Sequence, residues 1–181
     1  MSRTLELGTV DFGSKVYASD PCYTADTWCL VKLENVLPGE YRCYAVIEDT
    51  GSWGDRVSHL YAVHSDYILD RNQLEPVEGD VGVDSGQCGL YDADYFLQTR
   101  DNEDWYWAVC DVTGERSGYT GGVYQDKCVV SCSGYGDGGY ELSVQRDDDG
   151  KIVAMDIDFF VEEDFEREKE KEKDVEEDME M

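Results

Sequence analysis

The strongest constraint on the fold is the regular alternation of apolar and polar side chains between Lys151 and Phe159. An extended chain places successive side chains on opposite sides, so the pattern predicts a β-strand. One side carries Val153, Met155, Ile157 and Phe159, and the other carries Ala154, Asp156 and Asp158. We expect one buried and one wet face. The turn-forming run 147–150 joins this strand to Tyr140–Arg146, which predicts an antiparallel hairpin.

Similar short runs recur along the chain between Gly- and Asp-rich turns. Aromatic residues make up 12% of the 181 residues, with thirteen Tyr, and this favours pleated, half-buried surfaces. We predict a mainly β fold, an antiparallel β-sandwich or partly open barrel of about nine strands. Trp28–Val36 and Tyr41–Glu48 resemble a further hairpin, and Trp105–Val112 resembles a strand. One short helix is expected after Asp92, its capping residue.

Charge divides the chain into two parts. The formal net charge is −27 at pH 7, and twelve acidic and four basic residues fall in 161–181, so a charge of −19 remains on residues 1–160. We expect a β-rich domain over 1–160 and an acidic tail over 161–181 that is disordered or partly helical. Repulsion from phosphates argues against direct binding of nucleic acid or an anionic membrane. No long apolar segment is visible, and we expect a cytoplasmic protein.

Three segments place an aspartate among turn-forming residues beside a β-like run: 19–23, 83–89 and 133–140. If they meet, four carboxylates could hold a hard cation, Mg²⁺ or Ca²⁺, which could activate water for attack on a phosphate ester. These candidate ligands are Asp20, Asp84, Asp92 and Asp137, with Asp84 and Asp137 as the catalytic candidates. The alternative is that each aspartate stabilises its own turn through backbone hydrogen bonds, without any cofactor.

Aromatic side chains lie in or beside the same segments and could line a pocket for a flat ligand or a partner's side chain. The candidates for ligand binding are Tyr23, Trp53, Gln87, Tyr91, Tyr135 and Tyr140, and Trp28 lies close by. Core packing of a sandwich is the alternative explanation for these rings.

Cysteine and histidine allow one further hypothesis. The chain has seven cysteines and two histidines. We interpret most of the thiols as reduced and buried. A Cys–His nucleophile pair, formed by Cys22 or Cys88 with His64, stays open, although no spacing favours it.

Two blocks carry a resemblance to a known family. Val81-Gly-Val-Asp-Ser-Gly-Gln-Cys-Gly-Leu-Tyr-Asp92 is the first, and Gly134-Tyr-Gly-Asp-Gly-Gly-Tyr140 followed by the closing hairpin is the second. Together with the Asp20-Pro21-Cys22 element, they resemble the uncharacterised family of bacteria and their viruses catalogued as domain of unknown function 4241. The resemblance covers patches of about 15–160 and implies a β-rich fold and a bacterial or phage origin, with no activity.

These observations favour a non-enzymatic acidic binding protein. It would act on a basic host protein or a small ligand through its Gly- and Asp-rich turns, in the host cytoplasm if it is viral. The alternative is a metal-dependent phosphate-ester hydrolase that uses the four aspartates. A third hypothesis is mimicry of a nucleic-acid backbone by regularly placed carboxylates.

Overall fold

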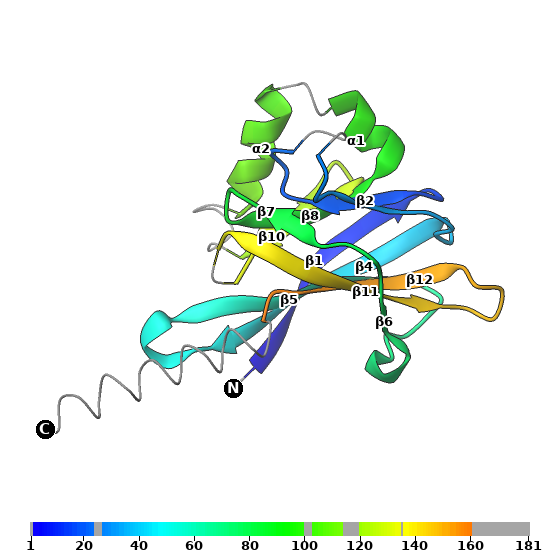
Figure 1. Ribbon diagram of the computed structural model, residues 1–181, viewed down its shortest axis with the longest axis horizontal. Helices are drawn as coiled ribbons and strands as arrows, with labels where there is room; N and C mark the ends of the chain where they lie inside the picture. Colours follow the sequence, from blue (N-terminus) through cyan, green and yellow to red (C-terminus); the bar gives the residue numbers. More distant parts are fainter. Residues whose placement is uncertain (1, 24–26, 100–102, 114–119, 135, 161–181) are drawn as a thin grey trace, which may run out of the picture.

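The computed structural model describes residues 2–23, 27–99, 103–113, 120–134 and 136–160. Within these residues, antiparallel strands form two stacked sheets, and the predicted mainly β, sandwich-like fold is confirmed (Figure 1). The larger sheet has the order β1 (Ser2–Phe12), β4 (Gly39–Asp49), β5 (Asp55–His64), β12 (Ile152–Asp158), β11 (Gly138–Arg146) and β6 (Glu75–Pro76), and β7 (Val81–Val83) also pairs with β11. The smaller sheet has the order β3 (Val31–Leu33), β2 (Val16–Ser19), β8 (Gln87–Asp92), β10 (Cys128–Cys132) and β9 (Gly121–Tyr124).

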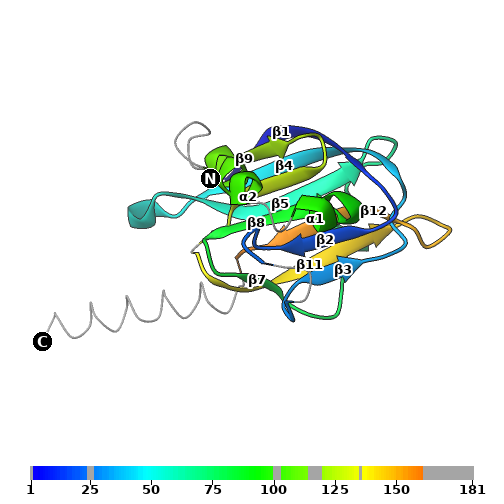
Figure 2. The ribbon, with the colours of Figure 1, turned by 90° about the horizontal axis from the view of Figure 1, so that it is seen from above.

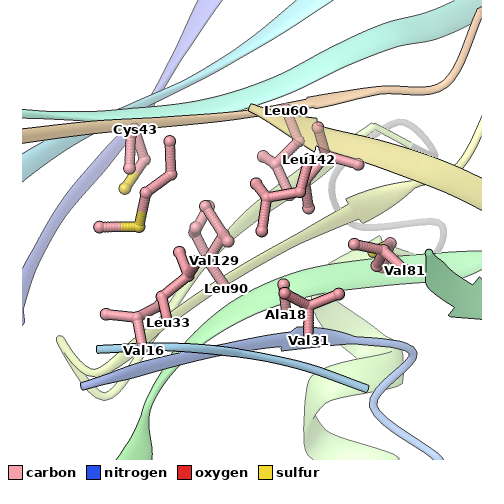
Figure 3. Packing of buried hydrophobic residues seen from close by; sticks show 14 of the residues in the cluster. Val16, Ala18, Val31, Leu33, Cys43, Leu60, Val81, Leu90, Val129 and Leu142 are labelled. Atoms are coloured by element: carbon pink, nitrogen blue, oxygen red, sulfur yellow. The ribbon is translucent and has the colours of Figure 1, made fainter. Parts of the chain in front are cut away.

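The main core fills the space between the two sheets. Figure 3 shows side chains of both sheets meeting there, among them Val16, Leu90 and Val129 from the smaller sheet and Cys43, Leu60 and Leu142 from the larger. Most of these side chains are aliphatic, so their burial supplies the hydrophobic stabilisation that holds the sheets together. Four of the seven cysteines, Cys29, Cys43, Cys88 and Cys128, are buried free thiols, as expected.

Two α-helices, α1 (Ala93–Thr99) and α2 (Glu103–Thr113), cover the outer side of the smaller sheet (Figure 1). The prediction of a strand at Trp105–Val112 was therefore wrong. Trp105, Val109 and Thr113 are buried at intervals of four residues, which is the spacing of one helix face. Trp105 and Val109 join Phe96 and Tyr91 in a second core between the helices and the sheet.

The closing hairpin is confirmed, because β11 pairs with β12 in antiparallel register. The expected wet face of β12 was wrong, since Ala154 and Asp156 are both buried. The segment that contains the short 3₁₀ helix η2 (Arg71–Gln73) lies over this face, and Arg71 Nη1 is 3.4 Å from Asp156 Oδ1. This covering segment lacks a regular pattern of apolar residues, so the sequence does not indicate that it packs on the sheet.

The hairpin expected at Trp28–Val36 and Tyr41–Glu48 was also wrong. β3 pairs with β2 in the smaller sheet, whereas β4 pairs with β1 and β5 in the larger sheet. The chain therefore changes sheets across 34–38, and the 3₁₀ helix η1 (Gly51–Trp53) follows β4 before β5.

Strand β7 connects the two sheets at one edge of the sandwich. It pairs with the first residues of β11, and Figure 2 shows the two strands side by side. Gly82 in β7 also accepts a backbone hydrogen bond from Asp20 N and donates one to Cys29 O, next to β2 and β3. This position brings turns from three parts of the chain together. Within the described residues, no helix is long and apolar enough to cross a membrane.

Candidate functional site

Asp20 joins the first two of the three marked segments. Its carboxylate accepts hydrogen bonds from Cys22 N and Ser85 Oγ at Oδ1, both at 2.8 Å, and from Asp84 N and Ser85 N at Oδ2. The residue is completely buried. A buried carboxylate is stable only when donors satisfy its oxygens, and here four do so. Asp20 therefore holds the 20–23 turn against the 83–86 turn.

The third segment is attached through Asp137. Its Oδ1 accepts a hydrogen bond from Gly86 N at 3.1 Å, and Ser133 N donates to Gly86 O at 3.1 Å. The marked segments around residues 20, 84 and 137 thus meet at one edge of the sandwich. The sequence-based expectation that these distant turns come together is confirmed.

Gly82 allows the turns to approach closely. A Cβ atom at this position would collide with Cys29 Sγ and lie 3.0 Å from a ring carbon of Tyr23. In the β7–β11 ladder Gly82 is opposite Gly139, so the two strands carry no side chain at this register. The bare backbone makes room for the Tyr23 ring and leaves an open floor beside it.

A cleft of about 560 Å³ opens over this floor. Three carboxylates line it, those of Asp80, Asp84 and Asp137, and all three residues are exposed. Two aromatic side chains, Tyr23 and Trp28, complete the polar and aromatic lining, and Trp28 is 89% exposed. An exposed indole beside several carboxylates is an arrangement suited to a positively charged organic group.

Tyr23 and Asp84 form a direct pair inside the cleft. Tyr23 Oη donates to Asp84 Oδ2 at 2.5 Å. Burial, together with this hydrogen bond, raises the pKa of the Tyr23 phenol well above its usual range. The phenol therefore stays protonated, continues to donate to Asp84, and keeps its ring fixed at the wall of the cleft.

Cys22 lies at the base of the same junction and is an exposed thiol. Partial burial of the sulfur, its hydrogen bond to Asp20 and the negative charges of Asp20 and Asp84 raise the pKa of this thiol to about 12. The reactive form of cysteine is the thiolate, which is scarce at neutral pH when the pKa is this high. The surroundings of Cys22 thus oppose a role as nucleophile.

Asp92 is the one candidate metal ligand that the structure places elsewhere. It ends β8, about 17 Å along the strand from Gln87. Its carboxylate accepts hydrogen bonds from Gly13 N at 2.8 Å and Tyr95 N at 3.1 Å, so it caps α1 as expected. Among the described residues, no group of three or more His, Cys, Asp or Glu side chains is arranged to hold a metal ion.

The other candidate ligand-binding residues have structural partners. Tyr91 is fully buried and donates to Ser19 O, and Tyr140 donates to Ser133 O and Gly136 O. Gln87 joins β8 to α2, because its amide contacts Cys110 Sγ and accepts from Thr113 Oγ1. Tyr135 and the side chain of Trp53 lie outside what the structure describes.

Among the hydrogen bonds that the structure shows, none joins His59 or His64 to a residue of the cleft. His64 Nε2 is 3.2 Å from Pro38 O, and its Nδ1 accepts from Asp66 N at 3.1 Å. His59 Nδ1 is 3.1 Å from Asp156 Oδ2, on the covered outer face of the larger sheet. Burial alone would lower the pKa of His59, but Asp156 and Asp158 outweigh it, so the pKa is raised.

Asp80 and Cys29 are parts of the site that were not predicted from the sequence. Asp80 follows Gly79 directly before β7, and the Gly-Asp pair resembles the other marked turns. The Gly-Asp pair is therefore a usable signal, although it lies in a polar and irregular segment. Cys29 had no sequence signal, because its role is to pack beneath Gly82.

Comparisons with protein-family models, with curated proteins and with solved structures find no significant match. The resemblance to the uncharacterised family therefore stays a prediction.

Proposed function

We propose that this chain is a non-enzymatic binding protein whose cleft receives a positively charged side chain of a basic partner. The observation that supports this most is the joint presence of Trp28, Tyr23 and three carboxylates around one opening. Aromatic faces attract cations, and carboxylates accept the hydrogen bonds of a guanidinium or ammonium group. Asp80 has no hydrogen bond or ion pair within the described residues, so its carboxylate is available to a ligand.

The overall charge supports the same kind of partner. A net charge of −27 attracts basic proteins over long distances and raises their association rate. Because salt screens such attraction, the affinity should fall as the ionic strength rises. The cleft then supplies the local specificity that the general charge does not.

The test uses a ten-residue peptide with one central arginine and otherwise uncharged residues, titrated into the full chain by calorimetry. The same peptide with citrulline, which is uncharged and nearly isosteric, is the control ligand. We expect the arginine peptide to bind and the citrulline peptide to bind more weakly, by up to about fivefold, the size of an exposed charge contact.

Two variants connect the binding to the cleft. Asp80→Asn and Trp28→Ala should each weaken binding of the arginine peptide. Asp148→Asn, at an exposed hairpin turn, should leave the affinity for this peptide unchanged. Equal binding of the two peptides, or wild-type affinity in both cleft variants, would overturn the proposal.

A further inference from the structure

A second cleft, of about 430 Å³, is lined by residues of the same turns that line the first. Gly86 and Gly136 line this second cleft, whereas their neighbours Asp84 and Asp137 line the first. The hydrogen bond from Gly86 N to Asp137 Oδ1 therefore marks the boundary between the two openings. A partner that covers this boundary contacts both clefts.

The second cleft differs from the first in the sign of its charged groups. Arg3 and Arg56 line it, together with Asp55. Arg3 is paired in the sheet with Ile47, which is paired with Val57, and both of these residues are buried. Leu5, two residues further on, packs against the main core. Arg3 therefore extends from the inner face of the larger sheet, near the start of β1.

The two guanidinium groups are positioned by contacts that the structure shows. Arg3 Nη2 lies 3.3 Å from Asp55 Oδ2, and the Arg3 side chain is 63% exposed. Arg56 Nη1 donates to Gly134 O at 3.4 Å, which places it beside the 133–136 turn. A guanidinium has five N–H donors in a planar fork, so the contact with Asp55 does not use all the donors of Arg3.

Two arginines at one opening are suited to an oxyanion such as a carboxylate. A free small anion is repelled by the net charge of −27, so this cleft is poorly suited to capturing one alone. The repulsion matters less for an anionic group that belongs to the same partner as the cation bound in the first cleft. Once the cation is bound, the anionic group reaches the second cleft in an intramolecular step.

We infer that the partner presents an acidic side chain near its basic one, and that its carboxylate binds at Arg3 and Arg56 while its cation occupies the Asp80 cleft. This inference rests on the proposed function. It adds a requirement for the partner: a basic surface alone is insufficient for full affinity, and a neighbouring carboxylate is needed.

The test uses peptides that carry one arginine and one glutamate, separated by one to six residues, and a matched series with glutamine in place of glutamate. Binding to the full chain is measured by calorimetry. At one separation at least, the glutamate peptide should bind about fivefold more tightly than its glutamine match, as expected for an exposed ion pair.

Variants assign that gain to the second cleft. Arg3→Gln and Arg56→Gln should remove the advantage of glutamate, whereas Arg146→Gln, at the exposed end of β11, should keep it. Asp80→Asn should lower the affinity for the glutamate peptide and for its glutamine match by the same factor.

The outcomes separate the inference from the proposed function. Equal binding of glutamate and glutamine peptides at every separation would overturn the inference and leave the proposed function intact. An advantage that survives in both arginine variants would also overturn it, because the carboxylate would then bind elsewhere. If no arginine peptide binds at all, the proposed function is wrong and the inference falls with it.

Discussion

The two ends of β8 use aspartate in opposite ways. At the Gln87 end, Asp20 joins distant turns, and Asp80, Asp84 and Asp137 remain exposed around a cleft. At the other end, Asp92 is nearly buried and caps the helix that follows. From sequence alone, Asp92 was expected to lie with Asp20, Asp84 and Asp137. The difference shows that the role of an aspartate depends on the backbone N–H groups near it. Where these groups donate hydrogen bonds to its carboxylate oxygens, the aspartate stabilises the fold, and where they do not, the oxygens can bind a ligand.

Among the substitutions that test this comparison, Asp20→Ala should have the largest effect on stability. The substitution leaves the backbone N–H groups of Cys22, Asp84 and Ser85 without their acceptor in a buried junction. Unsatisfied buried donors are costly, so we expect a loss of about 3 kcal/mol or more in the free energy of unfolding. Urea denaturation measures it. A loss below about 1 kcal/mol would mean that the junction does not need this carboxylate.

Gly82→Ala should have the next largest effect. The new methyl group would collide with Cys29 and displace the Tyr23 ring, at a cost of about 2 kcal/mol, and binding of the arginine peptide should weaken. Gly139→Ala is the matched control for the stability loss alone, because it lies opposite in the same ladder, lines the same cleft, and its Cβ would be 3.4 Å from Asp80 Cβ, close to an ordinary contact. Equal effects of the two substitutions would argue against a special role for Gly82.

Asp92→Ala should cost about 1 kcal/mol, because it removes a helix cap and the acceptor for Gly13 N. Binding of the arginine peptide at the opposite end should not change. Thermal unfolding and calorimetry on the same variant measure both quantities. A change in peptide affinity would show that the two ends of β8 are coupled, contrary to the comparison.

We expect the smallest effect from His59, which contacts Asp156 and lies at neither end of β8. Its pKa is raised in the folded state, so the protonated ring contributes stability that is complete below its ordinary pKa of 6.5 and is lost as the pH rises through the higher folded value. Urea denaturation at a series of pH values from 5 upward should show this loss. His59→Gln should remove that part of the dependence, and an unchanged curve would contradict the assignment.

Local pattern was sufficient for part of the fold. The closing hairpin could be predicted because its alternation and turn residues lie within twenty residues. Trp105–Val112 could not, because over eight residues its apolar positions fit both a strand and a helix, and packing against Phe96 and Tyr91 decides between them. Similarly, Trp28–Val36 has strand-forming residues, but its partner strand is set by the change of sheet.

The site was predictable in outline only. Asp and Gly next to β-like runs indicated shaped turns, and the three marked segments do meet, whereas Asp92 lies apart from them. The contribution of Asp80 and Cys29, and the separation of Asp92, depend on how β7 connects the sheets, which no short pattern encodes. The burial of Tyr91 and Tyr140 likewise follows from packing between layers rather than from their neighbours in sequence.

The most direct measurement for the central claim is mapping of backbone amide chemical shifts during titration with the arginine peptide. If the cleft binds the cation, the largest shifts should fall on the amides of 80–86 and 137–139, with Trp28 and its indole N–H, and they should vanish with the citrulline peptide. Shifts spread evenly over the acidic surface, or centred on the Asp92 end of β8, would contradict it.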